Sequence, residues 1–166
     1  VSVEAVMGIV ESPPGFVTAG SVKFRGTELR EMEEARLCKI RGHNIAMIFQ
    51  EPQATLDPGF KVGHQISEML RLHRGLSQEE ARKRSVELMD RVQIPLAVER
   101  ANDYPHQFSG GMCQRVMIAM ALALDPDVLI ADEPTTALDV TIQAQVMQLL
   151  SELQTETGMG IILITH

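Results

Sequence analysis

The sequence is poor in cysteine and aromatic residues, and it contains no tryptophan. Its two cysteines, Cys38 and Cys113, are too few for a disulfide framework, so we expect reduced thiols rather than a disulfide-stapled secreted scaffold. No stretch approaches the roughly 18 consecutive apolar residues of a membrane-spanning helix, and no charged-then-apolar leader opens the chain. We therefore expect any work at a membrane to depend on partner proteins.

Positive charge is also scarce, because 15 Lys and Arg residues against 22 Asp and Glu residues give a formal net charge of -7. A general nucleic-acid surface needs a basic stripe that displaces counterions from phosphates, so no nucleic-acid partner is expected. His43, His64, His73 and His106 lack the spacing of a zinc site. A hydrophobic fraction of 45% in 166 residues is typical of one globular domain.

Hydrophobic periodicity predicts an α/β fold with a parallel sheet. The Asp127–Ala131 run leads into acids, as a central parallel strand does where its carboxyl end opens on a site. The following helix and the apolar run Ile161–Ile164 imply a right-handed parallel crossover. Further strands are expected at Ser21–Arg25 and Asn44–Phe49. Helices are expected at Val1–Val10, within 62–92, from Ser109 to about Leu124, and from about Ile142 to Gly158. Ser77 and Glu80 have the spacing of a capping box at a helix start within 62–92.

These elements predict one partial domain. Residues 1–49 and 126–166 would form the sheet core with a small antiparallel β region, and residues 50–125 would form a helical insert. Val1 and His166 both have the character of cut ends, so we expect the domain to be truncated at both ends.

The sharpest local signal is Phe108-Ser109-Gly110-Gly111-Met112, followed by Gln114-Arg115. A hydroxyl and unobstructed backbone N–H groups at a helix N-terminus suit an anion such as a terminal phosphate. Taken alone, the same residues are about as consistent with a helix cap and a tight turn.

Two acids, Asp132 and Glu133, follow the apolar run. At a strand end they are placed to hold Mg²⁺ through water and to orient or deprotonate an attacking water. The alternative is that they cap a helix after Pro134, which Thr135 or Thr136 could do as well.

The order of these motifs resembles ABC ATPases. The serine-glycine segment matches the signature sequence, the acidic strand end matches Walker B, and Ala137-Leu138-Asp139 matches the D-loop. Gln50 matches the Q-loop and His166 the switch histidine, so the matches cover nearly the whole chain. The resemblance implies a P-loop NTPase fold and ATP hydrolysis with Mg²⁺.

The resemblance also implies a head-to-tail dimer, identical or paralogous, with nucleotide sandwiched between the two domains. Glu133 would be the catalytic base, and Asp132 and Gln50 would hold Mg²⁺ through water. His166 would bond the γ-phosphate. The residues expected to contact the γ-phosphate bound to the opposite subunit are Ser109, Gly110, Gly111 and Met112, and Asp139 belongs to the D-loop.

Three departures from the family pattern stand out. The sequence contains no Gly-Lys pair and thus no G-x-x-x-x-G-K-[ST] phosphate loop. We expect Val1–Val10 to be the helix that follows this loop, with its start and the upstream adenine-stacking residue removed, so this chain alone should bind ATP weakly. Met112 replaces Gln, and Cys113 replaces the usual Arg, which removes a cation near a phosphate site.

Local stretches resemble the ATP-binding subunits of bacterial dipeptide, oligopeptide and nickel importers: Phe49–Pro52, Leu56–Pro58, Tyr104–Phe108 and Val116–Ala121. This implies permease subunits, indirectly a periplasmic or lipoprotein solute-binding protein, and a peripheral place on the cytoplasmic face of the inner membrane. Residues around Gln50 would receive the coupling helix of the permease. The alternatives are a nickel importer, an ABC ATPase acting on DNA or ribosomes, and a catalytically silent binding module.

Overall fold

The computed structural model describes residues 2–9, 17–136 and 138–165. Its main sheet has three parallel strands in the order β3 (Ile45–Ile48), β4 (Val128–Asp132) and β5 (Gly160–Ile164). Residues 129–131 of β4 are buried, as expected for a strand that is paired on both edges and covered on both faces. The α/β class and the central position of β4 are therefore confirmed. Because the strands are parallel, their carboxyl ends meet at one edge of the sheet.

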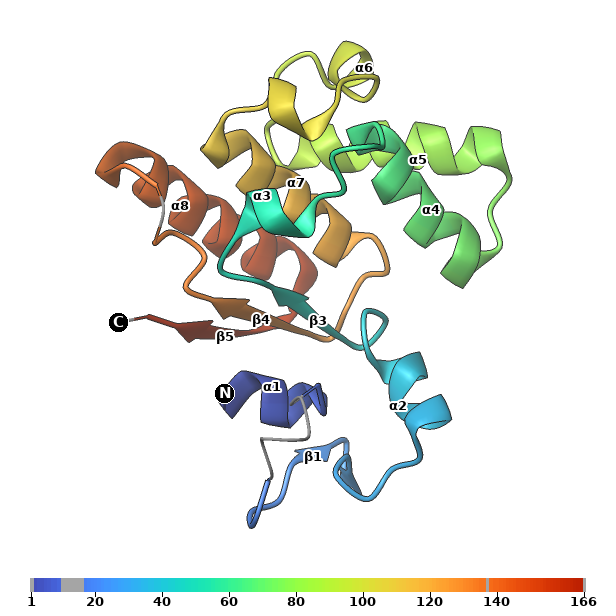
Figure 1. Ribbon diagram of the computed structural model, residues 1–166, viewed down its shortest axis with the longest axis vertical. Coiled ribbons are helices and arrows are strands. Elements are labelled where there is room, and N and C mark those ends of the chain that lie inside the picture. The colour runs from blue at the N-terminus through green and yellow to red at the C-terminus, as the bar shows by residue number, and fades with distance from the viewer. Residues whose placement is uncertain (1, 10–16, 137, 166) are drawn as a thin grey trace.

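Different residues of the sheet face two separate cores, one on each side (Figure 1). Ala46, Ile48 and Leu129 belong to the larger core with the long helices. Ile45 and Ile130 pack on the other side with Met7 of α1 (Ser2–Met7) and Leu37 of α2 (Glu34–Ile40). This alternation follows from the period of two along a strand.

The expected small antiparallel sheet is present, but it is shorter than predicted. It pairs β1 (Lys23–Phe24) with β2 (Thr27–Glu28), whereas the sequence predicted a strand over Ser21–Arg25. Arg25 and Gly26 have φ angles of 48° and 80°, so the chain already turns there. Two successive residues with positive φ suit a tight hairpin turn, which ends the strand early.

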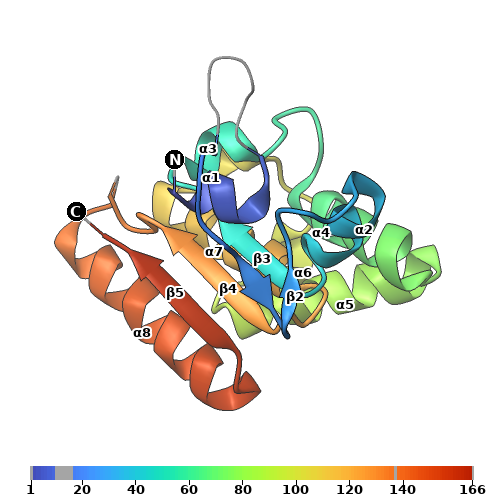
Figure 2. The same ribbon diagram turned by 90° about the horizontal axis from the view of Figure 1, so that it is seen from below.

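The segment between β3 and β4 is helical, and its helices stack on one side of the sheet (Figures 1 and 2). The predicted capping box is confirmed: Ser77 Oγ accepts from the Glu80 amide, and the Glu80 carboxylate accepts from the Ser77 amide at 2.9 Å. The elements are α3 (Pro52–Thr55), α4 (Val62–Arg74), α5 (Gln78–Arg91), α6 (Ala97–Arg100), a 3-10 turn (Pro105–Gln107) and α7 (Gly110–Leu122).

A long helix, α8 (Val140–Thr157), connects β4 to β5 and confirms the predicted parallel crossover. It ends at Gly158, whose φ of 72° is the left-handed conformation of a helix C-cap. None of the described helices combines the length and the apolar character that a membrane crossing requires.

Candidate functional site

The site begins at the carboxyl end of β4, where Glu133 leaves the strand in an unusual conformation. Its φ is 46°, in the left-handed region that a residue with a side chain rarely adopts. Its amide donates to the Ile164 carbonyl at 3.0 Å, which continues the pairing with β5. Strain of this kind costs about 1–3 kcal/mol and tends to be found where a side chain must be aimed.

The Glu133 carboxylate accepts hydrogen bonds from two directions. The Gln50 amide nitrogen donates to Glu133 Oε2 at 2.9 Å, and the Thr136 hydroxyl donates to the same oxygen at 2.8 Å. Gln50 lies two residues after the end of β3, and Thr136 lies in the loop after β4. The sheet therefore brings together Gln50 and Glu133, which sequence reasoning named separately.

The predicted signature segment starts α7. Ser109 is the N-cap, and its hydroxyl accepts from the Met112 amide at 3.3 Å, which confirms the predicted cap. A Cβ added at Gly111 would lie 2.6 Å from Ile142 Cγ2, whereas one at Gly110 would lie 3.6 Å from Leu138 Cδ2. Gly111 is thus required by the packing of α7 on α8, in addition to any role with a ligand.

Cys113 does not occupy the place expected for it. Its side chain is 1% exposed, and its thiol donates to the Pro105 carbonyl with an S···O distance of 3.6 Å. Burial raises the pKa of this thiol above its usual value. The expectation that Cys113 replaces a cation beside a phosphate is wrong in this geometry, because the side chain faces the core.

The loop after Glu133 is fixed by α8. Asp139, the predicted D-loop acid, is the N-cap of α8 and accepts from the Ile142 amide at 3.0 Å. The Gln143 side chain donates to the Thr135 carbonyl at 3.0 Å and to the Leu138 carbonyl at 2.9 Å. The alternative that the acids cap a helix directly after Pro134 is wrong, since the next helix begins at Val140.

Sequence reasoning missed Thr136 as a partner of Glu133 and Gln143 as the anchor of the loop. The sequence did offer a signal for Gln143, because it is a polar residue directly after Ile142 in the apolar stripe of α8. No comparable signal marked Thr136. The predicted residues Ala137 and His166 lie outside the described residues.

Asp132 is the last residue of β4 and is half-buried. Within the described residues, no group of three or more His, Cys, Asp or Glu side chains could hold a metal ion. Mg²⁺ does not need such a cage, because it usually keeps several waters and binds through one or two carboxylates together with substrate phosphates.

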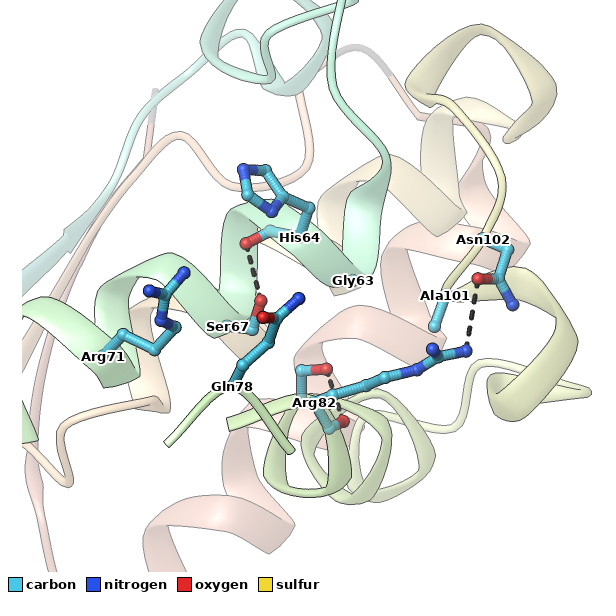
Figure 3. A pocket seen from close by; sticks show the side chains of 9 residues that line it. Gly63, His64, Ser67, Arg71, Gln78, Arg82, Ala101 and Asn102 are labelled. Carbon is cyan, nitrogen blue, oxygen red and sulfur yellow. Dashed lines mark hydrogen bonds between the residues drawn. The ribbon is translucent and has the colours of Figure 1, made fainter. Parts of the chain in front are cut away.

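A separate cavity of about 160 Å³ lies between α4 and α5 (Figure 3). Arg82 spans part of it and donates to the Asn102 side chain at 3.4 Å. Gly63 and Ala101 pack closely at its wall, where the Gly63 amide donates to the Ala101 carbonyl at 3.0 Å. This cavity belongs to the helical insert and contains none of the predicted site residues.

The fold and the site define the class of ATP-binding cassette ATPases, and comparison with solved structures gives the same class. The solved dimeric structure of the ATP-binding cassette MJ0796 in a post-hydrolysis state with ADP and Pi superposes with a TM-score of 0.77 at 35% identity, over 90% of this chain and 63% of that chain. The structure of cbiO1 from Clostridium perfringens, part of the ABC transporter complex cbiONQ, gives a TM-score of 0.79 at 29% identity, over 99% of this chain and 61% of that chain. The fold is thus that of an ATP-binding cassette.

The ABC transporter family model matches residues 4–136, and the chain belongs to this family. Oligopeptide transport ATP-binding protein OppD of Bacillus subtilis (strain 168) is 51% identical over 166 residues, covering 100% of this chain and 46% of that protein. A protein of Brucella abortus (strain 2308) that is named as a peptide import ATP-binding protein is 58% identical over 147 residues. The match covers 89% of this chain and 44% of the Brucella protein. The chain spans about half the length of these curated relatives.

Proposed function

We propose that this chain is the ATP-hydrolysing part of an ABC importer that takes up di- or oligopeptides. The observation that carries the proposal is the contact between Gln50 and Glu133 at the ends of two parallel strands. Family membership and the names of the relatives support the activity and the cargo. A nickel importer, or an ABC ATPase acting on DNA or ribosomes, is the alternative.

In the proposed reaction, a water oxygen attacks the γ-phosphorus, the bond to the bridging oxygen breaks, and ADP and phosphate leave. Glu133 accepts the proton of that water. Asp132 and the amide oxygen of Gln50 would hold Mg²⁺ through water, and their oxygens are ligands that this ion prefers. Mg²⁺ would neutralise the charge that develops on the phosphates.

The second half of the site would come from another ATP-binding subunit, identical or paralogous. Ser109, Gly110, Gly111 and Met112 of that subunit would contact the γ-phosphate, and His166 would bond it from within the same chain. Support comes from α7, which begins at these residues and so presents the positive end of a 13-residue helix. The dimeric neighbouring structure of MJ0796 also supports a pair of cassettes.

The proposed membrane partner is a pair of permease subunits, with a solute-binding protein acting through them. An apolar cavity of about 180 Å³ supports a docking surface near Gln50, because Phe49, the residue before Gln50, lines it together with Met47, Met69, Met117 and Met120. Phe49 is 41% exposed, an unusual position for a large apolar side chain. The proposed location is the cytoplasmic face of the inner membrane, and residues 50–125 form the proposed helical subdomain.

The test requires a protein in which a G-x-x-x-x-G-K-[ST] segment precedes this chain, called here the loop-completed protein. We expect it to bind and hydrolyse MgATP. Glu133→Gln should keep MgATP binding but slow turnover at least about a hundredfold, the usual scale for losing a general base. Failure of the loop-completed protein to bind MgATP would contradict the proposed activity, and unchanged turnover in Glu133→Gln would remove Glu133 from its role.

A further inference from the structure

We propose that Thr136 is a positioning residue for Glu133, a role that rests on the proposed ATPase function. The Thr136 hydroxyl donates to Glu133 Oε2 at 2.8 Å. The Thr136 amide also donates to the Glu133 carbonyl at 3.3 Å. The two residues are therefore joined through both backbone and side chain, three positions apart in one loop.

The hydrogen bond from Thr136 restricts the orientation of the Glu133 side chain, which the backbone conformation of Glu133 alone does not fix. A left-handed residue directly after a strand sends its side chain out of the regular alternation of β4. A carboxylate loses efficiency as a base when it samples several rotamers, because misplacement by about 1 Å can cost a hundredfold in rate. A hydroxyl fixed three residues away restricts that sampling.

Gln50 and Thr136 share the same acceptor oxygen, but they are anchored differently. Gln50 lies between β3 and α3, at the entrance to the helical insert, 83 positions from Glu133. Thr136 belongs to the same loop as Glu133, and Gln143 holds this loop through the carbonyls of Thr135 and Leu138. If the helical insert shifts, the Gln50 bond shifts with it, whereas the Thr136 bond stays with the carboxylate.

The effect should be smaller than that of losing the base. We expect Thr136→Val in the loop-completed protein to lower kcat roughly tenfold, below the 10²–10⁴ of a lost general base. The KM for MgATP should change by less than about twofold, because the hydroxyl orients a side chain rather than holding the nucleotide. Thr136→Ser keeps the hydroxyl and should restore kcat to within about twofold of the parent.

The matched control is Thr135→Val, the same chemical change one position earlier. Within the described residues, the Thr135 side chain makes no hydrogen bond, and only its backbone carbonyl is used. We expect Thr135→Val to keep the parent kcat. Equilibrium MgATP binding and the thermal midpoint, measured on every variant, should match those of the parent and so exclude a fold defect as the cause.

The double variant tests whether Thr136 acts through Glu133. In the Glu133→Gln protein, adding Thr136→Val should change the residual turnover by less than about twofold, since the two residues act as a unit. The inference would be overturned by parent-like kcat in Thr136→Val, by failure of Thr136→Ser to restore it, or by a further large loss in the double variant. If Glu133→Gln itself leaves turnover unchanged, Glu133 is not the base and the inference about Thr136 falls with it. The proposed function fails instead if the loop-completed parent protein neither binds nor hydrolyses MgATP.

Discussion

Gln50 donates its side-chain amide hydrogen to the Glu133 carboxylate across 2.9 Å, although 83 positions separate the two residues. The contact exists because β3 and β4 are parallel neighbours. Ile45 pairs with Val128 at one end of the ladder, and Ile48 pairs with Ala131 at the other. Their carboxyl ends therefore deliver both side chains to one edge of the sheet. In open α/β sheets this edge is the usual place for ligands.

Ser109→Arg should abolish ATP-dependent dimerisation of the loop-completed protein. The substitution puts bulk and charge where the proposed phosphate sandwich closes, and it also removes the N-cap of α7. Sedimentation or size-exclusion measurements with and without MgATP, in the Glu133→Gln background, would detect the change.

Ser77→Arg is the matched control, because Ser77 is likewise the N-cap of a helix but lies in the helical insert. Each variant should lose about 0.5–2 kcal/mol of stability from the missing cap. Only Ser109→Arg should lose the dimer. Equal dimerisation in both variants would contradict the proposed role of Ser109.

Gly111→Ala should destabilise the protein by about 1–3 kcal/mol, the range expected for overpacking. The new Cβ would approach Ile142 Cγ2 to 2.6 Å, and a β-branched side chain yields little. Gly110→Ala meets Leu138 Cδ2 only at 3.6 Å and should cost less. Urea unfolding of both variants measures the difference.

A second substitution checks the cause. Ile142→Ala removes the opposing methyl group, so the added cost of Gly111→Ala should shrink in that background. An undiminished cost would mean that Gly111 is required for its backbone rather than for packing on α8.

Local signals in the sequence were sufficient for much of the fold. Ser77 and Ser109 were recognised as N-caps, and Gly158 as a helix end, because capping chemistry depends on residues within one helical turn. The run before Asp132 was recognised as a central strand because both faces of such a strand are apolar.

Contacts between distant segments could not be predicted in the same way. The clash that requires Gly111 involves Ile142 on another helix, and the bond from Gln50 to Glu133 depends on strand order. The antiparallel pair was predicted, but its early turn at Arg25 was not, because a positive φ at a residue with a side chain has no strong signature in the sequence. The proposed roles of the site residues remain predictions.

Cys113 should resist alkylation in the folded protein, whereas Cys38 should react. Cys113 is 1% exposed and Cys38 is exposed, and burial raises the pKa of the Cys113 thiol, which leaves less of the reactive thiolate. Iodoacetamide at mildly alkaline pH, followed by peptide mass spectrometry, compares the two sites directly. Equal rates would contradict the burial of Cys113.

The raised pKa of the Cys113 thiol also determines how the stability of the folded protein changes with pH. A folded-state pKa above the unfolded value means that the neutral thiol contributes stability fully below the unfolded pKa. This contribution is lost as the pH rises through the folded pKa. Cys113→Ala should therefore weaken the loss of stability on the alkaline side, and Cys38→Ala should leave it unchanged.

The most direct test of the proposed ATPase is a structure of the loop-completed Glu133→Gln protein with MgATP. We expect a head-to-tail dimer in which Ser109 of one copy and residue 133 of the other lie against the same γ-phosphate. A bound nucleotide with these two places far apart would contradict it.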